Sequence, residues 1–391
     1  MIFKSGIPLK VTFVFILLRN IKSFQPSFLP SPSRAESYLE VATSREKFAS
    51  DTQSASHDDN LLAYYQERGN AILNKFYPSR YNPHPLLTNK HLQTILGVFI
   101  RDEEGCAYVN SEKNIFSQLI PVLKGVKAQL PNILGESNQE TSCDYWDERE
   151  KVLIDDDFFH VDHKYVDGEK LSRGLVVIVH GLESNSNSSL SQNLARAYHH
   201  YDFDVACLNF RGCSGVPNDS IFQYHAGFTN DIKHFIKLSS ERLKEDQSLY
   251  LSGFSLGTNI VMRCLGELGL DAAEKYNIRG AALLGVPFEL EPHHRQLIDD
   301  PFNRIIYAGN LLKSMKNKVD YLIDRFCGGD KNTNMINYWE CMNATTIAEI
   351  EDNWIAPLYG FQDKFDYYRQ TSSIPVMSRI AVPTFALNAV E

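Results

Sequence analysis

The sequence predicts an α/β fold in which helices cover both faces of a mostly parallel, doubly wound sheet. Three observations lead to this prediction. Short apolar segments typical of strands alternate with segments of helical spacing between residues 174 and 290. Several of these strand segments are continuously apolar, as buried parallel strands are. The pentapeptide Gly-Phe-Ser-Leu-Gly at 253–257 joins a strand to a helix. Such alternation favours a parallel sheet with helices packed on each side.

The elements follow in order along the chain. Residues 148–165 alternate apolar and polar positions on either side of Asp155 and Asp156, which indicates two strands joined by a turn. Further strands are expected at 174–181, 203–212, 248–257, 278–290 and 380–390. Helices are expected at 190–200, 226–243 and 258–268. Residues 291–372 are expected to be mostly helical and irregular.

The N-terminus differs from the rest of the chain. Lys4 and Lys10 precede an apolar run from Val11 to Leu18, and Arg19 follows it. This run is too short for a transmembrane helix, which needs about 20 residues. It fits the core of a secretory-type signal, and the following Ser-Phe-Gln-Pro-Ser-Phe resembles the junction of a bipartite algal plastid pre-sequence. The alternative is a disordered tail with a chance apolar patch.

Three regions are therefore expected. Residues 1–60 are a targeting leader with a polar linker, 61–145 a helical and irregular extension, and 146–391 the α/β domain. The leader points to the secretory or endomembrane path or to a plastid, and the compartment stays open. Peripheral or N-terminal membrane association is compatible with it.

Composition excludes several classes of function. The 391 residues carry a net charge of −9, and no Lys/Arg-rich block supports nucleic-acid binding. The seven cysteines form no Cys-x-x-Cys pair and their number is odd, so neither a zinc site nor a disulfide framework is expected. Buried free thiols are the simpler reading. No cofactor is expected.

Ser255 is the candidate nucleophile. The Gly-x-Ser-x-Gly pattern is weak alone, but an apolar strand before it and a helix after it are the setting of a nucleophile elbow. The helix that begins near Leu256 presents free N–H groups and a positive dipole end to a developing oxyanion. The alternative is a Ser that caps an ordinary helix.

A second motif begins at His180, at the end of the strand 174–181. In this kind of fold the loop after that strand supplies the other oxyanion donor. The two donors are then the backbone N–H groups of Leu182 and Leu256. His180 precedes the nucleophile, whereas the usual chain order is Ser, acid, His, so a structural role is expected for it.

With these motifs the chain resembles the AB hydrolase 4 family of the α/β-hydrolase superfamily, the embryogenesis-associated type. The resemblance runs from about residue 80 to 391 through eight segments. These are NKHLQTIL (89–96), DDDFFHVD (155–162), HGLESNS (180–186), NFRGCSG (209–215), YHAGFTND (224–231), GFSLGTN (253–259), APLYGFQDKFDYY (356–368) and VPTFALNA (382–389). It implies an α/β-hydrolase fold with a helical cap, here at about 291–372, a Ser–Asp–His triad, and hydrolysis of carboxylic esters of lipid type.

Individual positions also follow from the resemblance. Thr258 stands where many relatives carry Gly, and this change should be tolerated. His225 and Asp231 fall in a family segment and are interpreted as structural, and Arg211 as a loop anchor.

The resemblance places the acid and the base of the triad at or beyond the last residue of this sequence. Glu391 falls on the first of two acidic positions, the catalytic Asp would follow it, and the triad His would come later. All twelve histidines lie at or before His294. The last strand and helix of the fold are also expected to be missing. A truncated gene product is the favoured interpretation, and a non-catalytic relative is the other.

Internal residues could stand in for the missing groups. His293, His294, Glu289 and Glu291 follow the strand 278–290, whose carboxyl end faces the site in such folds. The alternative is that they are surface residues at a strand exit. The expected function is thus a serine esterase or lipase acting on a small lipid ester. A lipid-binding or regulatory protein that lacks the relay is the alternative, and the oligomeric state stays open.

Overall fold

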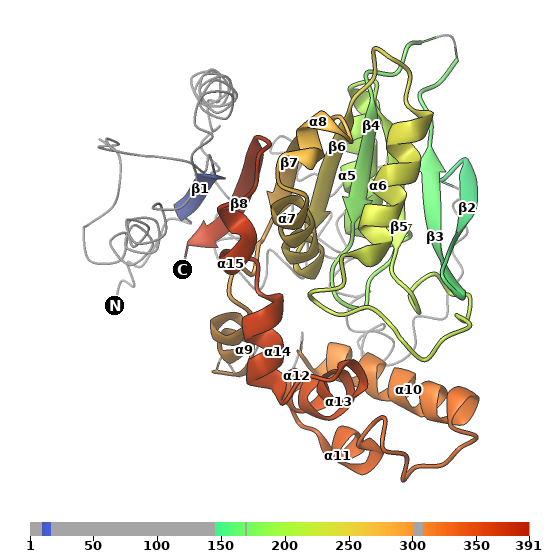
Figure 1. The fold of residues 1–391 in the computed structure, drawn as a ribbon, viewed down its shortest axis with the longest axis vertical. Coiled ribbons are helices and arrows are strands. Elements are labelled where there is room, and N and C mark those ends of the chain that lie inside the picture. Colours follow the sequence, from blue (N-terminus) through green and yellow to red (C-terminus); the bar gives the residue numbers. More distant parts are fainter. Residues whose placement is uncertain (1–9, 17–144, 169, 300–307, 391) are drawn as a thin grey trace, which may run out of the picture. The chain divides into compact units, whose positions relative to one another are not determined.

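The structure is a computed structural model that describes residues 10–16, 145–168, 170–299 and 308–390 (Figure 1). All of these belong to one compact unit, which comprises Met1–Ile16 and Pro78–Glu391. The linker, the extension and most of the expected leader lie outside the described residues, as does Glu391. No helix within the described ranges has the length and apolar character needed to cross a membrane.

The described residues form an eight-stranded sheet at the core of the domain, with the order β1-β8-β7-β6-β4-β5-β3-β2. The strands are β1 Lys10–Ile16, β2 Glu148–Ile154, β3 Asp157–Lys164, β4 Leu175–Val179, β5 Asp204–Asn209, β6 Leu249–Phe254, β7 Ile278–Leu284 and β8 Thr384–Val390. The pairs from β5 through β4, β6 and β7 to β8 are parallel. This confirms the predicted mostly parallel sheet.

The predicted hairpin lies at one end of the sheet. Strands β2 and β3 pair in antiparallel fashion, and β3 pairs with β5 in the same sense. Asp155 takes a φ of 50° in the connecting turn, a conformation that Asp tolerates better than most residues. At the other end, β1 pairs with β8. The apolar run expected as the core of a leader thus supplies an edge strand, and its targeting role stays a prediction.

Helices follow the strands as the sequence indicated. They are α5 Ser189–His200, α6 Asn230–Arg242, α7 Leu256–Leu268 and α8 Asp271–Glu274. Ala195 of α5 packs on side chains of β4 and β5, among them Ile178 and Cys207. Helix α7 packs against α6 and runs beside β6 and β4. The strands are buried because these helices cover them, which explains their continuous apolar sequence.

The strand expected at 278–290 is shorter than predicted. Strand β7 ends at Leu284, and Gly285 turns the chain with a φ of 69°. The apolar residues after it read like a strand in sequence, but they lead into helix α9, which begins at Leu290. Apolar composition alone does not distinguish a strand end from a buried loop.

A helical cap connects β7 to β8. Its elements are α9 Leu290–Asp299, α10 Gly309–Phe326, α11 Tyr338–Asn343, α12 Ile347–Ile350, a π-helix at Glu351–Ile355, α13 Ala356–Tyr359 and α14 Lys364–Thr371. The short helix α15, Ile374–Met377, then packs on α7 before β8 begins. The cap helices gather beside one end of the sheet (Figure 1).

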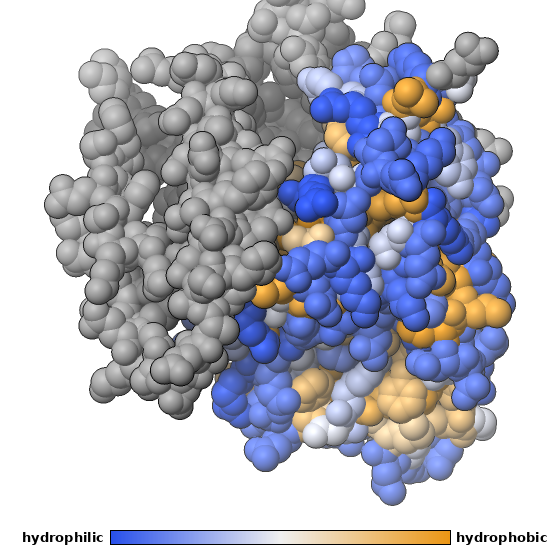
Figure 2. All heavy atoms as spheres, turned by 45° about the horizontal axis from the view of Figure 1, so that its top comes forward, coloured by the Kyte–Doolittle hydropathy of each residue, from blue (hydrophilic) through white to orange (hydrophobic). Residues whose placement is uncertain are grey.

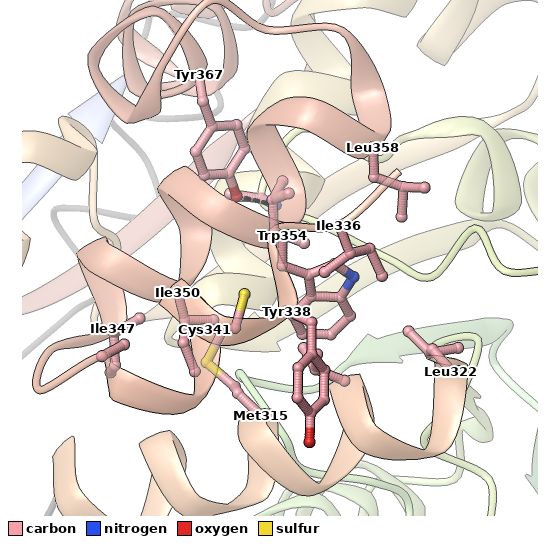
Figure 3. Close-up of a cluster of buried hydrophobic side chains, with 14 of the residues drawn as sticks. Met315, Leu322, Ile336, Tyr338, Cys341, Ile347, Ile350, Trp354, Leu358 and Tyr367 are labelled. Atoms are coloured by element: carbon pink, nitrogen blue, oxygen red, sulfur yellow. Dashed lines mark hydrogen bonds between the residues drawn. The ribbon is translucent and has the colours of Figure 1, made fainter. Parts of the chain in front are cut away.

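The cap has its own apolar core (Figure 3). Met315 and Leu322 of α10 pack with Cys341, Ile350 and Trp354, all of them buried. Leu182, in the loop after β4, and Leu256, the first residue of α7 after β6, pack against the same cluster. The cap therefore covers the carboxyl ends of these two strands. The coloured part of the face drawn in Figure 2 is mostly hydrophilic and carries separate hydrophobic patches.

Candidate active site

Ser255 lies at a sharp turn between β6 and α7. Its φ and ψ are 52° and −131°, a region that non-glycine residues rarely adopt. The Ser255 N–H donates to the carbonyl of Leu284 on β7 at 2.9 Å, which fixes the strained backbone to the sheet. The residue is exposed, whereas Gly253, Phe254 and Gly257 around it are buried. A strained, exposed Ser between a strand and a helix has the geometry of a nucleophile elbow.

Close backbone approach explains the glycines of the motif. A Cβ on Gly257 would lie 2.3 Å from the carbonyl oxygens of Val179 and His180. A Cβ on Gly253 would lie 2.8 Å from the Val179 carbonyl. Strand β4 thus ends against the elbow, and only glycine leaves enough room at these positions.

The two predicted oxyanion donors lie on the loop after β4 and in the first turn of α7, which meet here. Leu256 opens helix α7, so its N–H belongs to the first turn and has no partner within the helix. Leu182 follows Gly181, and a Cβ on Gly181 would lie 3.1 Å from the Ser255 Cβ. Within the described part of the chain, neither Leu N–H donates to a backbone acceptor. With no acceptor among the described residues, both N–H groups can bind an anion beside Ser255.

Thr258, which departs from the family pattern, stabilises the elbow. Its side chain is fully buried, and its hydroxyl donates to the Ser255 carbonyl at 2.5 Å. The Thr258 backbone N–H donates to the same oxygen at 2.9 Å. The Thr258 hydroxyl thus adds a hydrogen bond to the carbonyl of the strained residue.

His180 has a structural role in this geometry. Its Nδ1 lies 2.8 Å from the Gly181 carbonyl, and its Nε2 accepts from the Phe210 N–H at 3.2 Å. Burial lowers the pKa of His180 to about 4, so the ring is neutral with its proton on Nδ1. Both ring nitrogens are occupied, and neither can take a proton from Ser255.

The other candidate histidines are also held elsewhere. His225 Nδ1 accepts from the Gly227 N–H at 3.1 Å, and burial lowers its pKa to about 3. His294 Nε2 lies 3.3 Å from a carboxylate oxygen of Glu351, and its ring stacks on Tyr368. Among the described residues, no histidine is hydrogen bonded to the Ser255 hydroxyl. His294 is thus part of the cap's interior and not a surface residue. Within the described ranges, His293, Glu289 and Glu291 are likewise not hydrogen bonded to Ser255.

Arg211 and Asp231 form a buried ion pair. Arg211 donates from Nε and Nη2 to the Asp231 carboxylate, with a shortest distance of 2.7 Å. Asp157 lies 3.6 Å from the same guanidinium. The pair joins the loop after β5 to the start of α6, as expected for a loop anchor.

One feature of the site was not anticipated from the sequence. Glu183, directly after Leu182, is bound by Lys318 and Ser314 of the cap helix α10. Lys318 is 135 positions further along the chain. The only sequence signal was a charged residue next to an expected oxyanion donor, and nothing in the sequence identified its partners.

The described residues contain no cluster of His, Cys, Asp and Glu that could hold a metal ion. Five cysteines fall in the described ranges and all are free. Burial raises the pKa of Cys213 to about 11 and that of Cys264 to about 12, so these thiols are protonated at neutral pH.

Comparison with known proteins agrees with this geometry. Residues 170–325 match the Hydrolase_4 family, described as serine aminopeptidase, S33. The putative esterase YheT of Escherichia coli (strain K12) is 29% identical over 245 residues, which cover 63% of this chain and 68% of that protein. A monoacylglycerol lipase of Saccharomyces cerevisiae is 26% identical over 229 residues, covering 56% and 47% of the two chains. Phospholipase ABHD3 of Homo sapiens is 21% identical over 238 residues, covering 60% and 54%.

Solved structures include a soluble variant of monoglyceride lipase from Saccharomyces cerevisiae in complex with a substrate analogue. It is 17% identical with a TM-score of 0.33, and the match covers 44% of this chain and 54% of that chain. The chain spans about half the length of most of the curated relatives it matches, with shares of 53%, 50% and 47% for three of them.

Proposed function

We propose, on the premise that the chain is a member of the AB hydrolase family, that it hydrolyses carboxylic esters of small lipids, with Ser255 as nucleophile. The observation that carries this proposal is the elbow. An exposed Ser in a strained backbone conformation lies at the end of a strand that runs into a helix. The backbone N–H groups of Leu182 and Leu256 on the adjoining segments have no acceptor among the described residues.

The chemistry follows from the positions of these groups. The Ser255 hydroxyl oxygen attacks the ester carbonyl carbon and forms a tetrahedral intermediate. The backbone N–H groups of Leu182 and Leu256 bind its oxyanion, and the N-terminal end of α7 adds a favourable dipole. The bond to the alcohol then breaks, and the alcohol leaves with the proton that the Ser255 hydroxyl gave up. Water then hydrolyses the acyl-Ser255 ester, which releases the carboxylic acid and restores the hydroxyl. Each preorganised donor is worth roughly 10²–10³ in kcat in related chemistry.

The cap supports a lipid-like substrate. Leu182 and Leu256, whose backbones supply the donors, place their side chains against the apolar cluster of the cap. An acyl chain bound to Ser255 would lie beside this cluster, and burial of each methylene contributes about 0.8 kcal/mol. Relatives named monoacylglycerol lipase and medium-chain fatty acid ethyl ester synthase/esterase 2 agree with an acyl substrate of this type.

A second candidate function has one observation in its favour. No described histidine contacts Ser255, and Glu391 lies outside the described residues, so the structure does not place a general base. A protein with the elbow and the donors but no base would bind lipid esters without turning them over. Removal of a triad member leaves only the oxyanion-hole and binding contributions, roughly 10³–10⁴ over water.

A single set of assays separates the two functions. p-Nitrophenyl esters from acetate to palmitate and a monoacylglycerol are offered to the full chain and to Ser255→Ala, with an amino acid p-nitroanilide as the aminopeptidase substrate. We expect ester hydrolysis that depends on Ser255 and no cleavage of the anilide. Saturable binding of the lipid without Ser255-dependent turnover would favour the second function, and cleavage of the anilide alone would contradict both.

A further inference from the structure

The residue after the donor Leu182 is held in an unusual conformation. The Ser184 N–H donates to the Gly181 carbonyl at 3.3 Å, which closes a four-residue turn with Leu182 and Glu183 in the middle. Glu183 takes a φ of 52°. The third position of a turn with positive φ normally holds Gly or Asn, so a Glu there needs compensating contacts.

The Glu183 carboxylate has those contacts, and most come from the cap. Lys318 Nζ lies 2.7 Å from Oε1, and the Ser314 hydroxyl donates to Oε2 at 2.7 Å. Tyr224 donates to Oε1 at 3.1 Å and accepts from the Glu183 N–H at 2.7 Å. The side chains of Glu183 and Lys318 are only 7% and 12% exposed.

Both charges are matched within this cluster. Burial by itself would raise the pKa of Glu183, but the Lys318 ammonium and the two hydroxyl donors outweigh it, and the pKa lies below its ordinary value. Lys318 also lies 3.7 Å from the Cys213 sulfur and over the ring of Tyr224. Removal of one partner of a buried ion pair leaves an uncompensated charge, so the contact between Glu183 and Lys318 resists being broken.

We propose that Lys318 and Ser314 of cap helix α10, acting through the Glu183 carboxylate, position the turn 181–184 so that the Leu182 N–H faces the oxyanion at Ser255. These are positioning residues, and their role in catalysis rests on the proposed function. The turn starts beside Ser255, because a Cβ on Gly181 would lie 3.1 Å from the Ser255 Cβ. The position of the cap and the geometry of the oxyanion hole are thus linked through the buried ion pair between Glu183 and Lys318.

The test compares Lys318→Met with Lys316→Met in the full chain. Lys316 lies on the same helix and donates to the Met342 carbonyl within the cap, so the control removes the same charge without touching Glu183. Backbone amide hydrogen exchange is followed in peptides covering 180–186. The rate constant and the affinity for phosphonylation of Ser255 by a fluorophosphonate are measured separately.

For Lys318→Met we expect faster exchange at 180–186 and a rate constant lower by about 10- to 100-fold, with the affinity within about twofold, since an oxyanion donor acts on the transition state. Lys316→Met should leave both unchanged. Ser314→Ala should also speed the exchange at 180–186 and lower the rate constant, each by a smaller factor. Because this change removes no charge, it keeps the test valid if Lys318→Met loses its structure globally. Glu183→Gln combined with Lys318→Met should cost less than the sum of the single changes.

Two results would overturn the proposal. One is unchanged exchange at 180–186 in both Lys318→Met and Ser314→Ala. The other is a loss of affinity with an unchanged rate constant, which would make the ion pair a binding feature only. If the unsubstituted chain is not phosphonylated at Ser255, the proposed function fails. The hydrogen-exchange measurement then still shows whether helix α10 stabilises the turn 181–184.

Discussion

The backbone at Gly257 passes so close to His180 that a Cβ atom on residue 257 would lie 2.3 Å from the His180 carbonyl oxygen. The end of β4 and the first turn of α7 are thus in direct backbone contact, and Ser255 and Leu182 lie on either side of it. This contact brings the nucleophile and the loop of the second donor together. Its dependence on glycine can be measured.

Gly257→Ala should destabilise the domain by about 3 kcal/mol, because two backbone carbonyls cannot move away without disrupting β4. Denaturant unfolding gives the difference. The control is Gly215→Ala, whose Cβ would meet nothing within 4 Å although its φ is 79°. It should cost about 1 kcal/mol, from backbone conformation alone. Equal costs at the two positions would contradict the close approach.

Arg211→Leu should destabilise the domain by about 3–5 kcal/mol, since it leaves the carboxylate of Asp231 buried without its partner. The two side chains are 7% and 2% exposed. Arg325→Leu removes an exposed arginine that lies 3.5 Å from Asp219, and it should cost about 0–1 kcal/mol. Urea midpoints of the two variants are compared with that of the unsubstituted chain. A small effect of Arg211→Leu would mean that the pair does not anchor the loop after β5.

Glu351 should make the stability of the domain depend on pH. Burial raises its pKa from 4.5 to about 8, so its contribution to stability is complete below pH 4.5 and is lost as the pH rises through 8. Burial lowers the pKa of its neighbour His294 from 6.5 to about 4. The contribution of His294 to stability is therefore complete above pH 6.5 and is lost as the pH falls below that value. Between pH 6.5 and 8 the Glu351 effect therefore acts without opposition from His294.

We expect the free energy of unfolding to fall by about 2 kcal/mol across this window, at 1.36 kcal/mol for each pH unit. Glu351→Gln removes the titration and should flatten the curve. Glu289→Gln, an exposed position close to α9, should keep the slope of the unsubstituted chain. The same slope in Glu351→Gln would show that other groups cause the dependence.

Much of the sheet could be predicted because short stretches of adjacent residues identify its strands and turns. Strand β4 is a short apolar run before Gly181, and the Gly-x-Ser-x-Gly pattern identifies the turn at Ser255 from five adjacent residues. The predicted strand at 278–290 was too long because the residues after Leu284 are apolar, and apolar residues can be buried in a loop as well as in a strand. The pairing of Lys10–Ile16 with β8 joins the two ends of the chain, and no local pattern predicts it.

The contacts that complete the candidate site are long-range. Lys318 reaches Glu183 only because the cap folds back over the ends of β4 and β6. The sequence offers His294 as a replacement base because it follows a strand, yet its partners Glu351 and Tyr368 belong to the cap. Sequence spacing predicts the elbow well, but it cannot tell which distant side chains will surround it.

The identity of the nucleophile is the central claim, and mass spectrometry of a fluorophosphonate adduct tests it most directly. The full chain is treated with the probe, digested and mapped, beside Ser255→Ala and the control Ser240→Ala in α6. We expect one adduct, on Ser255, in the unsubstituted chain and in Ser240→Ala, and none in Ser255→Ala. An adduct that persists in Ser255→Ala, or an unsubstituted chain that carries none on Ser255, would contradict the account.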